Sequence, residues 1–202
     1  MNFQGSDYHE VVEEYGVHWN FFFTLAAVKV LSSVIFSHFG SHNALRAALA
    51  VGMGHHVLLT YTGIEESYIL NSSISRDESF IAANREGIAS TVGYLAIYLA
   101  SVYVGKVIYY SHKPKAEDWL RYGVRAFCQI SILWFLLWAL QSTPICRRSG
   151  NLSYIVWALA TNYTLLYIQF AISFFQVCFQ QLGLIHGPLI CYELKVCFFV
   201  FF

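Results

Sequence analysis

Charged residues are scarce in this chain of 202 residues. Asp, Glu, Lys and Arg together make up 12 % of it and hydrophobic residues 57 %, whereas a soluble domain usually carries about a quarter charged residues. Prolines are also few, and each lies in or beside a predicted connection between helices. They are Pro114, Pro144 and Pro188. With a mean hydropathy of +0.50, this composition excludes an ordinary water-soluble fold.

The chain also lacks an excess of charge of either sign and any cysteine pairing pattern. Twelve Lys and Arg balance twelve Asp and Glu, so we expect no nucleic-acid partner, which would need a basic face. The five cysteines form no Cys-x-x-Cys pair, so we expect neither a disulfide framework nor a metal site. The opening segment is polar and acidic, so we expect no cleavable signal peptide.

Long apolar runs dominate the chain instead. Five runs are long enough to cross a hydrocarbon core of about 30 Å at about 1.5 Å per residue. They cover residues 21–37, 44–61, 87–110, 123–140 and 154–179. The pattern predicts an all-α fold, a polytopic transmembrane helical bundle of five spans, with residues 189–202 as a short sixth candidate. We expect residues 1–188 to form one membrane-embedded helical region and residues 189–202 a hydrophobic tail.

Helix parity predicts which segments share a side of the membrane. With five spans, the opening segment, residues 62–86 and residues 141–153 lie on one side. The opposite side carries six basic residues and this side four, which predicts that the opposite side is cytosolic. The six are Arg46, Lys106, Lys113, Lys115, Arg121 and Arg125, and the four are Arg76, Arg85, Arg147 and Arg148. Two glycosylation sequons, at Asn71 and Asn151, lie on the predicted non-cytosolic side.

A first polar cluster leads into the first apolar run on that side. It contains His18, and a neutral imidazole can take a proton from a hydroxyl nucleophile near neutral pH. Asn20 follows, and it is also a candidate cap for the helix that begins there. Tyr15 and Trp19 fit an aromatic belt at the membrane interface.

Two further polar clusters lie on the same side. In the second, residues 84–87, Arg85 could clamp a phosphate and Glu86 could meet the positive end of a helix dipole. A local cap with a surface ion pair explains these residues equally well. In the third, Arg147 and Arg148 suit an anionic headgroup or a coenzyme phosphate, although a juxtamembrane anchor is the commoner explanation. Parity places all three clusters together.

Three more ionisable residues fall inside predicted spans. Lys29 lies near the middle of the first run, where a cation is costly unless it is paired or hydrated. We therefore expect Lys29 to line a functional cavity and to contact substrate rather than to snorkel. His55 and His56 lie late in the second run, and a polar packing contact is the favoured interpretation of each.

These stretches resemble the glucosaminyl-phosphatidylinositol acyltransferases of GPI-anchor assembly, also called GPI-anchored wall transfer proteins. The resemblance covers roughly residues 8–181. It rests on EYGVHWNFFFTL at residues 14–25, NREGI at 84–88 with GYLAIY at 93–98, and RR at 147–148 with NL at 151–152 and YIVW at 154–157. Members of that family carry further helices at both ends, so we expect this chain to correspond to part of their length.

The resemblance implies a multi-pass enzyme of the endoplasmic reticulum membrane that acylates the inositol of glucosaminyl-phosphatidylinositol from acyl-coenzyme A, with no bound cofactor. For this reaction we expect His18 to act as the base, with Glu86 as the alternative, and Asn20 or a backbone amide to meet the oxyanion. Arg85, or Arg147 with Arg148, would hold phosphate. The sequence does not identify a protein partner.

Two other functions remain open at this point. The first is a different membrane-bound O-acyltransferase built on an intramembrane histidine, which here would be His55 or His56. The second is a non-catalytic lipid-binding or accessory membrane subunit.

Overall fold

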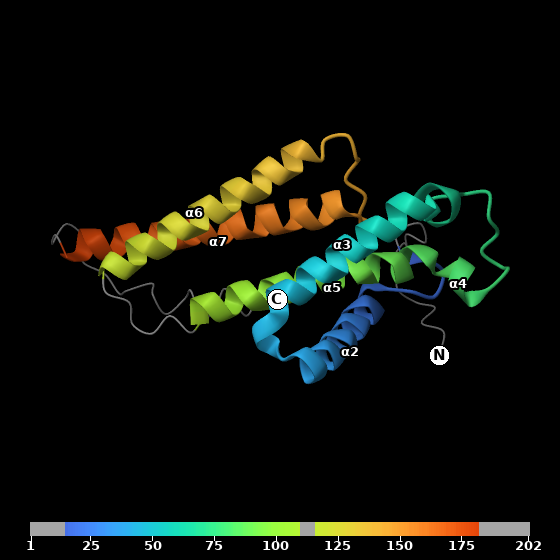
Figure 1. Ribbon diagram of the computed structural model, residues 1–202, viewed down its shortest axis with the longest axis horizontal. Helices are drawn as coiled ribbons and strands as arrows, with labels where there is room; N and C mark the ends of the chain where they lie inside the picture. The colour runs from blue at the N-terminus through green and yellow to red at the C-terminus, as the bar shows by residue number, and fades with distance from the viewer. Residues whose placement is uncertain (1–14, 110–115, 182–202) are drawn as a thin grey trace, which may run out of the picture. The chain divides into compact units, whose positions relative to one another are not determined.

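The computed structural model describes residues 15–109 and 116–181 of the chain. Within these ranges all regular elements are helical and there is no strand, which confirms the predicted all-α class. Figure 1 shows the helices. In chain order they are α2 (Phe21–Phe39), η1 (Ser41–Asn43), α3 (Ala44–Thr62), η2 (Glu65–Ile69), α4 (Phe80–Ala83), α5 (Arg85–Tyr109), α6 (Ala116–Ala139) and α7 (Leu152–Gln181).

The boundaries of α2 show why its sequence forms a helix there. The Asn20 side chain accepts a hydrogen bond from the Phe23 backbone N–H at 3.0 Å, so Asn20 is the N-cap. The helix ends at Gly40, whose φ of 71° lies in the left-handed region. Glycine adopts that region without steric cost, and a glycine there commonly ends a helix.

Four helices in the described part of the chain are long and apolar enough to cross a membrane: Phe21–Phe39, Arg85–Val107, Leu120–Ala139 and Leu152–Gln176. They correspond to the first, third, fourth and fifth predicted spans. The second predicted run is the helix α3, but it is not among these four, since Arg46, His55 and His56 make it more polar. Its crossing of the membrane stays a prediction. The sixth candidate, residues 189–202, lies outside the described residues, as do Lys113 and Lys115.

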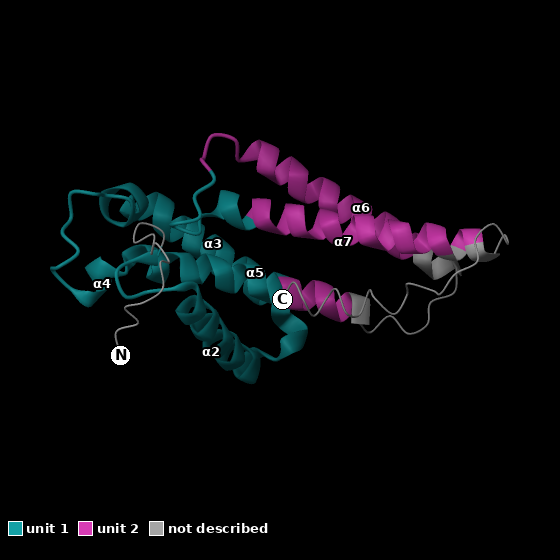
Figure 2. Cartoon of the chain, turned by 180° about the vertical axis from the view of Figure 1, so that it is seen from behind, with its two compact units in different colours: residues 1–100, 145–155 teal, residues 101–144, 156–202 magenta. Residues whose placement is uncertain are grey.

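The chain divides into two compact units, shown in Figure 2. Unit 1 comprises Met1–Ala100 and Ile145–Ile155, and unit 2 comprises Ser101–Pro144 and Val156–Phe202. In unit 1, α3 packs closely on α5: a Cβ at Gly52 would lie 3.6 Å from that of Ala96. The helix α2 contacts α5 where Lys29 meets Tyr98. Leu59 and Leu99 are buried in this core.

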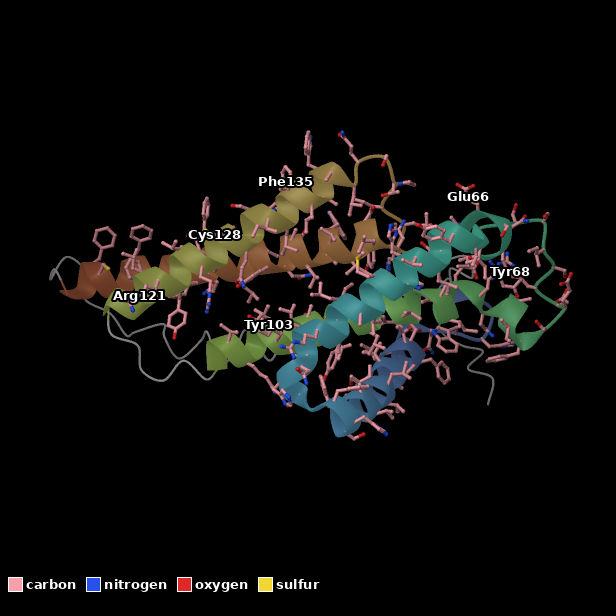
Figure 3. All side chains as sticks on the ribbon, in the orientation of Figure 1. Glu66, Tyr68, Tyr103, Arg121, Cys128 and Phe135 are labelled. Atoms are coloured by element: carbon pink, nitrogen blue, oxygen red, sulfur yellow. The ribbon has the colours of Figure 1, made fainter. Side chains whose placement is uncertain are left out.

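In unit 2, α6 and α7 pack as an antiparallel pair. Trp134 donates a hydrogen bond to Thr164 (3.1 Å), and Tyr163 donates one to Gln129 (2.6 Å). Many apolar side chains of α6 are exposed, among them Phe127, Ile132 and Phe135; Figure 3 labels Arg121, Cys128 and Phe135 in order along this helix. An apolar face of this kind suits contact with lipid or with other membrane helices.

Candidate functional site

The first two polar clusters are joined by backbone hydrogen bonds in unit 1. The Val17 N–H donates to the Ala83 carbonyl (3.0 Å), and the His18 N–H donates to the side-chain oxygen of Asn84 (2.8 Å). Gly16, the residue before Val17, has a φ of 122°. Residues with a Cβ rarely adopt this backbone conformation, whereas glycine adopts it readily. Asn84 is fully buried, so the segment entering α2 is fixed against the start of α5.

Trp19 and Gly87 pack closely where the segment before α2 meets the start of α5. A Cβ at Gly87 would overlap the Trp19 ring and the Tyr15 carbonyl, so only glycine allows this approach. The Trp19 indole donates a hydrogen bond to the buried hydroxyl of Thr24 at 2.9 Å. Trp19 therefore has a specific packing role, and its place in an interfacial belt stays a prediction.

Glu86 lies at the centre of an arginine cluster formed by Arg76, Arg85 and Arg148. Its side chain is 0 % exposed, and Arg76 contacts both carboxylate oxygens, at 2.7 and 3.1 Å. The Arg85 Nε lies 3.7 Å and an Arg148 nitrogen 3.5 Å from the same carboxylate. These guanidinium groups bring an excess of positive charge to one buried carboxylate, which favours an anion nearby. Both oxygens of Glu86 are thus occupied, which does not suit the base role considered from the sequence.

Arg85 does not present a free guanidinium to a ligand. Its side chain is 3 % exposed, and it donates hydrogen bonds to the backbone carbonyls of Ile69 (3.2 Å), Asn71 (2.7 Å) and Ile74 (3.3 Å). The structure therefore gives Arg85 the role of holding the loop before α4. The predicted phosphate contact at Arg85 has no support in this geometry.

Arg147 contacts two tyrosines, Tyr15 and Tyr94. Its guanidinium donates to the Tyr15 hydroxyl and to the Tyr94 hydroxyl (3.0 Å), and it lies 5.3 Å from the centre of the Tyr15 ring. Tyr154 in turn donates to the Tyr94 hydroxyl at 3.2 Å. The Arg147 side chain remains exposed, so it combines a fixed position with access from outside.

Arg148 is the least satisfied arginine of the cluster. Its side chain is 38 % exposed, and it forms a 3.5 Å ion pair with Glu86. Its Nε is buried without a hydrogen-bond partner among the described residues. Because 38 % of its side chain is exposed, the Arg148 guanidinium can still donate to an anionic ligand.

The loop that carries both arginines is held by Glu65 and His55. The Glu65 carboxylate accepts hydrogen bonds from the Ser149 hydroxyl (2.6 Å) and from the Asn151 amide (3.2 Å). The buried His55 ring meets the Ser149 carbonyl at 2.9 Å, which is the polar packing contact expected from the sequence. His56 contacts Thr60 in its own helix at 3.4 Å. This arrangement does not favour an enzyme built on either histidine.

The remaining predicted residues lie at or beyond the rim of this cluster. The His18 side chain is exposed while its backbone is fixed, and Asn20 caps α2, as one of its two interpretations predicted. Lys29 is exposed on α2 rather than enclosed, with its ammonium 3.4 Å from the Tyr98 hydroxyl. Nine residues separate it from Asn20, which is about 13 Å along a helix. The cavity expected around Lys29 stays a prediction.

The structure thus brings the three clusters together, as parity predicted, and adds residues that the sequence did not single out. Arg76 and Glu65 both lie in the polar segment after α3. That segment was predicted to lie on the same side of the membrane as the clusters. The opposite charges of Arg76 and Glu86 were therefore the one signal in the sequence that could have indicated this contact. Tyr94 was recognised only as part of a motif.

Comparison with known proteins shows the family. A family model described as GWT1 matches residues 1–188. The chain belongs to the GWT1 family. Among its relatives, "GPI-anchored wall transfer protein 1" of Aspergillus fumigatus is 35 % identical over 185 residues, 82 % of this chain and 35 % of that protein. The GWT1 match covers all three polar clusters.

Two other relatives carry names that describe a reaction or a pathway. The human "Glucosaminyl-phosphatidylinositol-acyltransferase PIGW" is 31 % identical over 164 residues, 79 % of this chain and 32 % of that protein. The "Phosphatidylinositol-glycan biosynthesis class W protein" of Dictyostelium discoideum is 36 % identical over 159 residues, 77 % of this chain and 31 % of that protein. The chain spans about a third of the length of these GWT1-family relatives.

Proposed function

We propose that this chain acts in GPI-anchor biosynthesis, in the transfer of a fatty acyl group from acyl-coenzyme A to an inositol hydroxyl of glucosaminyl-phosphatidylinositol. Membership of the GWT1 family supports this proposal, as does the name of the human relative. The observation that carries it furthest is that three segments distant in the sequence contact one another around the start of α5. The segments that begin at Tyr15, Asn84 and Arg147 meet in one polar, arginine-rich cluster at the ends of apolar helices.

In the proposed reaction, the inositol oxygen attacks the thioester carbonyl and the carbon–sulfur bond breaks. His18 takes the proton of the hydroxyl and returns one to the leaving thiolate, because its imidazole is exposed while its backbone is fixed. Asn20 uses its side-chain oxygen to cap α2, which leaves its N–H groups to stabilise the oxyanion. The acyl chain lies among apolar helices, where burial contributes about 0.8 kcal/mol per methylene.

Arg147 and Arg148 hold the phosphate of the acceptor lipid in this proposal. Both are accessible, because Arg147 is exposed and the Arg148 side chain is 38 % exposed. Arg85 and Glu86 support them from within the protein: Arg85 holds the preceding loop, and Glu86 positions Arg148. Lys29 stays a candidate for acyl-coenzyme A binding, separate from the phosphate site.

We also propose that α3 is a fifth membrane crossing. The segments just before α2 and α5 are hydrogen-bonded to each other through Val17 and Ala83, so the chain that leaves along α2 returns to the same level before α5. The helix α3 makes that return with 19 residues, as many as α2 has, or about 28 Å. The three clusters then face the lumen of the endoplasmic reticulum.

Cysteine labelling tests this topology. In a background without the native cysteines, Ser75→Cys reports the segment before α4, and His42→Cys reports the turn between α2 and α3. Both positions are exposed. A membrane-impermeant maleimide should label the Cys at 75 from the lumenal side and the Cys at 42 from the cytosolic side. Labelling of both from one side would exclude α3 as a crossing.

The function itself is tested by mass spectrometry of GPI precursors in cells that lack their own inositol acyltransferase. Expression of this chain should restore precursors with an acylated inositol. A chain that inserts at normal levels and binds glucosaminyl-phosphatidylinositol, yet restores no acylated precursor, would instead be a non-catalytic lipid-binding subunit.

A further inference from the structure

The two glycosylation sequons of the chain differ sharply in their surroundings. Asn71-Ser72-Ser73 lies in the loop between η2 and α4, and Asn151-Leu152-Ser153 lies at the start of α7. An N-glycan needs an asparagine on the surface, with room for a bulky polar chain. The local structure therefore decides which sequon can carry one.

Asn151 is a structural residue. It is 5 % exposed, its side-chain oxygen accepts hydrogen bonds from the Tyr154 N–H (3.0 Å) and the Cys146 N–H (3.3 Å), and its amide donates to Glu65 (3.2 Å). It caps α7 and links three segments. A sugar on this nitrogen would displace buried hydrogen bonds and disrupt the loop that carries the arginines.

Asn71 is half-buried, and its side chain has only local partners among the described residues. Its side-chain oxygen accepts hydrogen bonds from the backbone N–H and the hydroxyl of Ser73 (2.9 and 2.6 Å), and its amide donates to the Ser67 carbonyl (3.1 Å). Ser72 and Ser73 are exposed. The Asn71 carbonyl is fixed by Arg85 from the protein side, so a modified side chain can turn outward without loss of that contact.

We propose that Asn71 is an N-glycosylation site and that Asn151 is not. The Asn71 amide nitrogen forms a bond to the anomeric carbon of an oligosaccharide carried on a polyprenyl diphosphate. The bond from that carbon to the diphosphate oxygen breaks, the diphosphate lipid leaves, and the amide loses a proton. The glycan extends from the loop that Arg85 holds, on the lumenal side of the membrane. This site is independent of the acyl-transfer chemistry.

Enzymatic deglycosylation of the full chain, expressed in eukaryotic cells, tests the proposal. Treatment with peptide N-glycosidase should increase the gel mobility of the wild-type chain by one step and convert Asn71 to Asp in its peptide. The Asn71→Gln and Ser73→Ala variants should run at the deglycosylated position without treatment. The matched control Ser153→Ala, which removes the other sequon but keeps its asparagine, should shift like the wild type. A wild-type chain that does not shift, or a shift that survives Asn71→Gln, would overturn the assignment.

Discussion

Arg76 forms a bidentate ion pair with Glu86: its two terminal guanidinium nitrogens donate hydrogen bonds to the two carboxylate oxygens, at 2.7 and 3.1 Å. The short helix α4 lies between the two residues in the sequence. This two-point contact closes the segment between them into a loop whose ends are fixed. It also gives a fully buried carboxylate the charge-assisted hydrogen bonds that burial requires. The remaining guanidinium groups, from Arg85 and Arg148, then share the same carboxylate at longer range.

Replacing Glu86 by Gln should therefore destabilise the fold. The amide leaves three guanidinium groups without their common counter-charge, and breaking a buried ion pair costs about 3–5 kcal/mol. Thermal unfolding in detergent measures the loss. Glu66→Gln is the matched control, because Glu66 is exposed on η2 (Figure 3). Equal midpoints for the two variants would show that the arginine cluster does not depend on Glu86.

Arg85→Lys should loosen the loop before α4 although it keeps the charge. An ammonium group cannot reproduce the planar set of donors that contacts the carbonyls of Ile69, Asn71 and Ile74. Loss of even one such hydrogen bond costs about 1.5–3 kcal/mol. Hydrogen exchange in residues 69–74 should accelerate. Arg125→Lys, on the exposed surface of α6, should leave the exchange rate of residues 69–74 unchanged. Unaltered exchange in the Arg85 variant would mean that the loop is held by other contacts.

Lys29→Met tests the proposed role of the cation within α2. A lysine near the centre of a span costs about 2.5–3.5 kcal/mol on insertion scales, so the variant should insert at least as well as the wild type. Acyl transfer should fall, because the ammonium near Tyr98 is lost. Lys106→Met, in the last turn of α5, is the control. Normal turnover in the Lys29 variant would identify Lys29 as a tolerated polar residue.

Helix positions and the meeting of the clusters could be predicted from the sequence, because both depend on length and periodicity. The apolar run at residues 21–37 became α2 with Asn20 as its cap. Helix parity predicted that the starts of α2 and α5 lie on the same side of the membrane. The hydrogen bond from Val17 to Ala83 agrees with this prediction, because it joins the segments just before the two helices.

The partners within the site could not be predicted, because they depend on how polar loops fold. Arg85 and Arg76 carry the same charge and lie on the same side, yet Arg76 binds Glu86 while Arg85 binds backbone carbonyls. Only the path of the loop decides between them. The position of Lys29 in the first run predicts its depth, but depth does not determine which way a side chain faces. Lys29 is exposed on α2, and its place in a cavity stays a prediction.

His18→Ala should lower turnover while substrate binding is largely retained. A general base contributes about two to four orders of magnitude to the rate, and the backbone N–H that positions this segment on Asn84 is kept. Steady-state kinetics in membranes separates kcat from KM. His42→Ala, in the exposed turn after α2, is the control. A kcat loss below about tenfold would fall short of general base catalysis and leave His18 a positioning role.

The central claim, that the converging clusters form the acyl-transfer site, is tested most directly by the kinetics of Arg148→Ala. Loss of a charge-assisted contact of about 1.5–3 kcal/mol should raise KM for glucosaminyl-phosphatidylinositol by about 10- to 150-fold and leave kcat largely intact. Arg121→Ala, exposed on α6 (Figure 3), should behave as the wild type. If Arg148→Ala inserts normally and keeps both the wild-type KM and kcat, the arginine cluster is a membrane anchor and the site lies elsewhere.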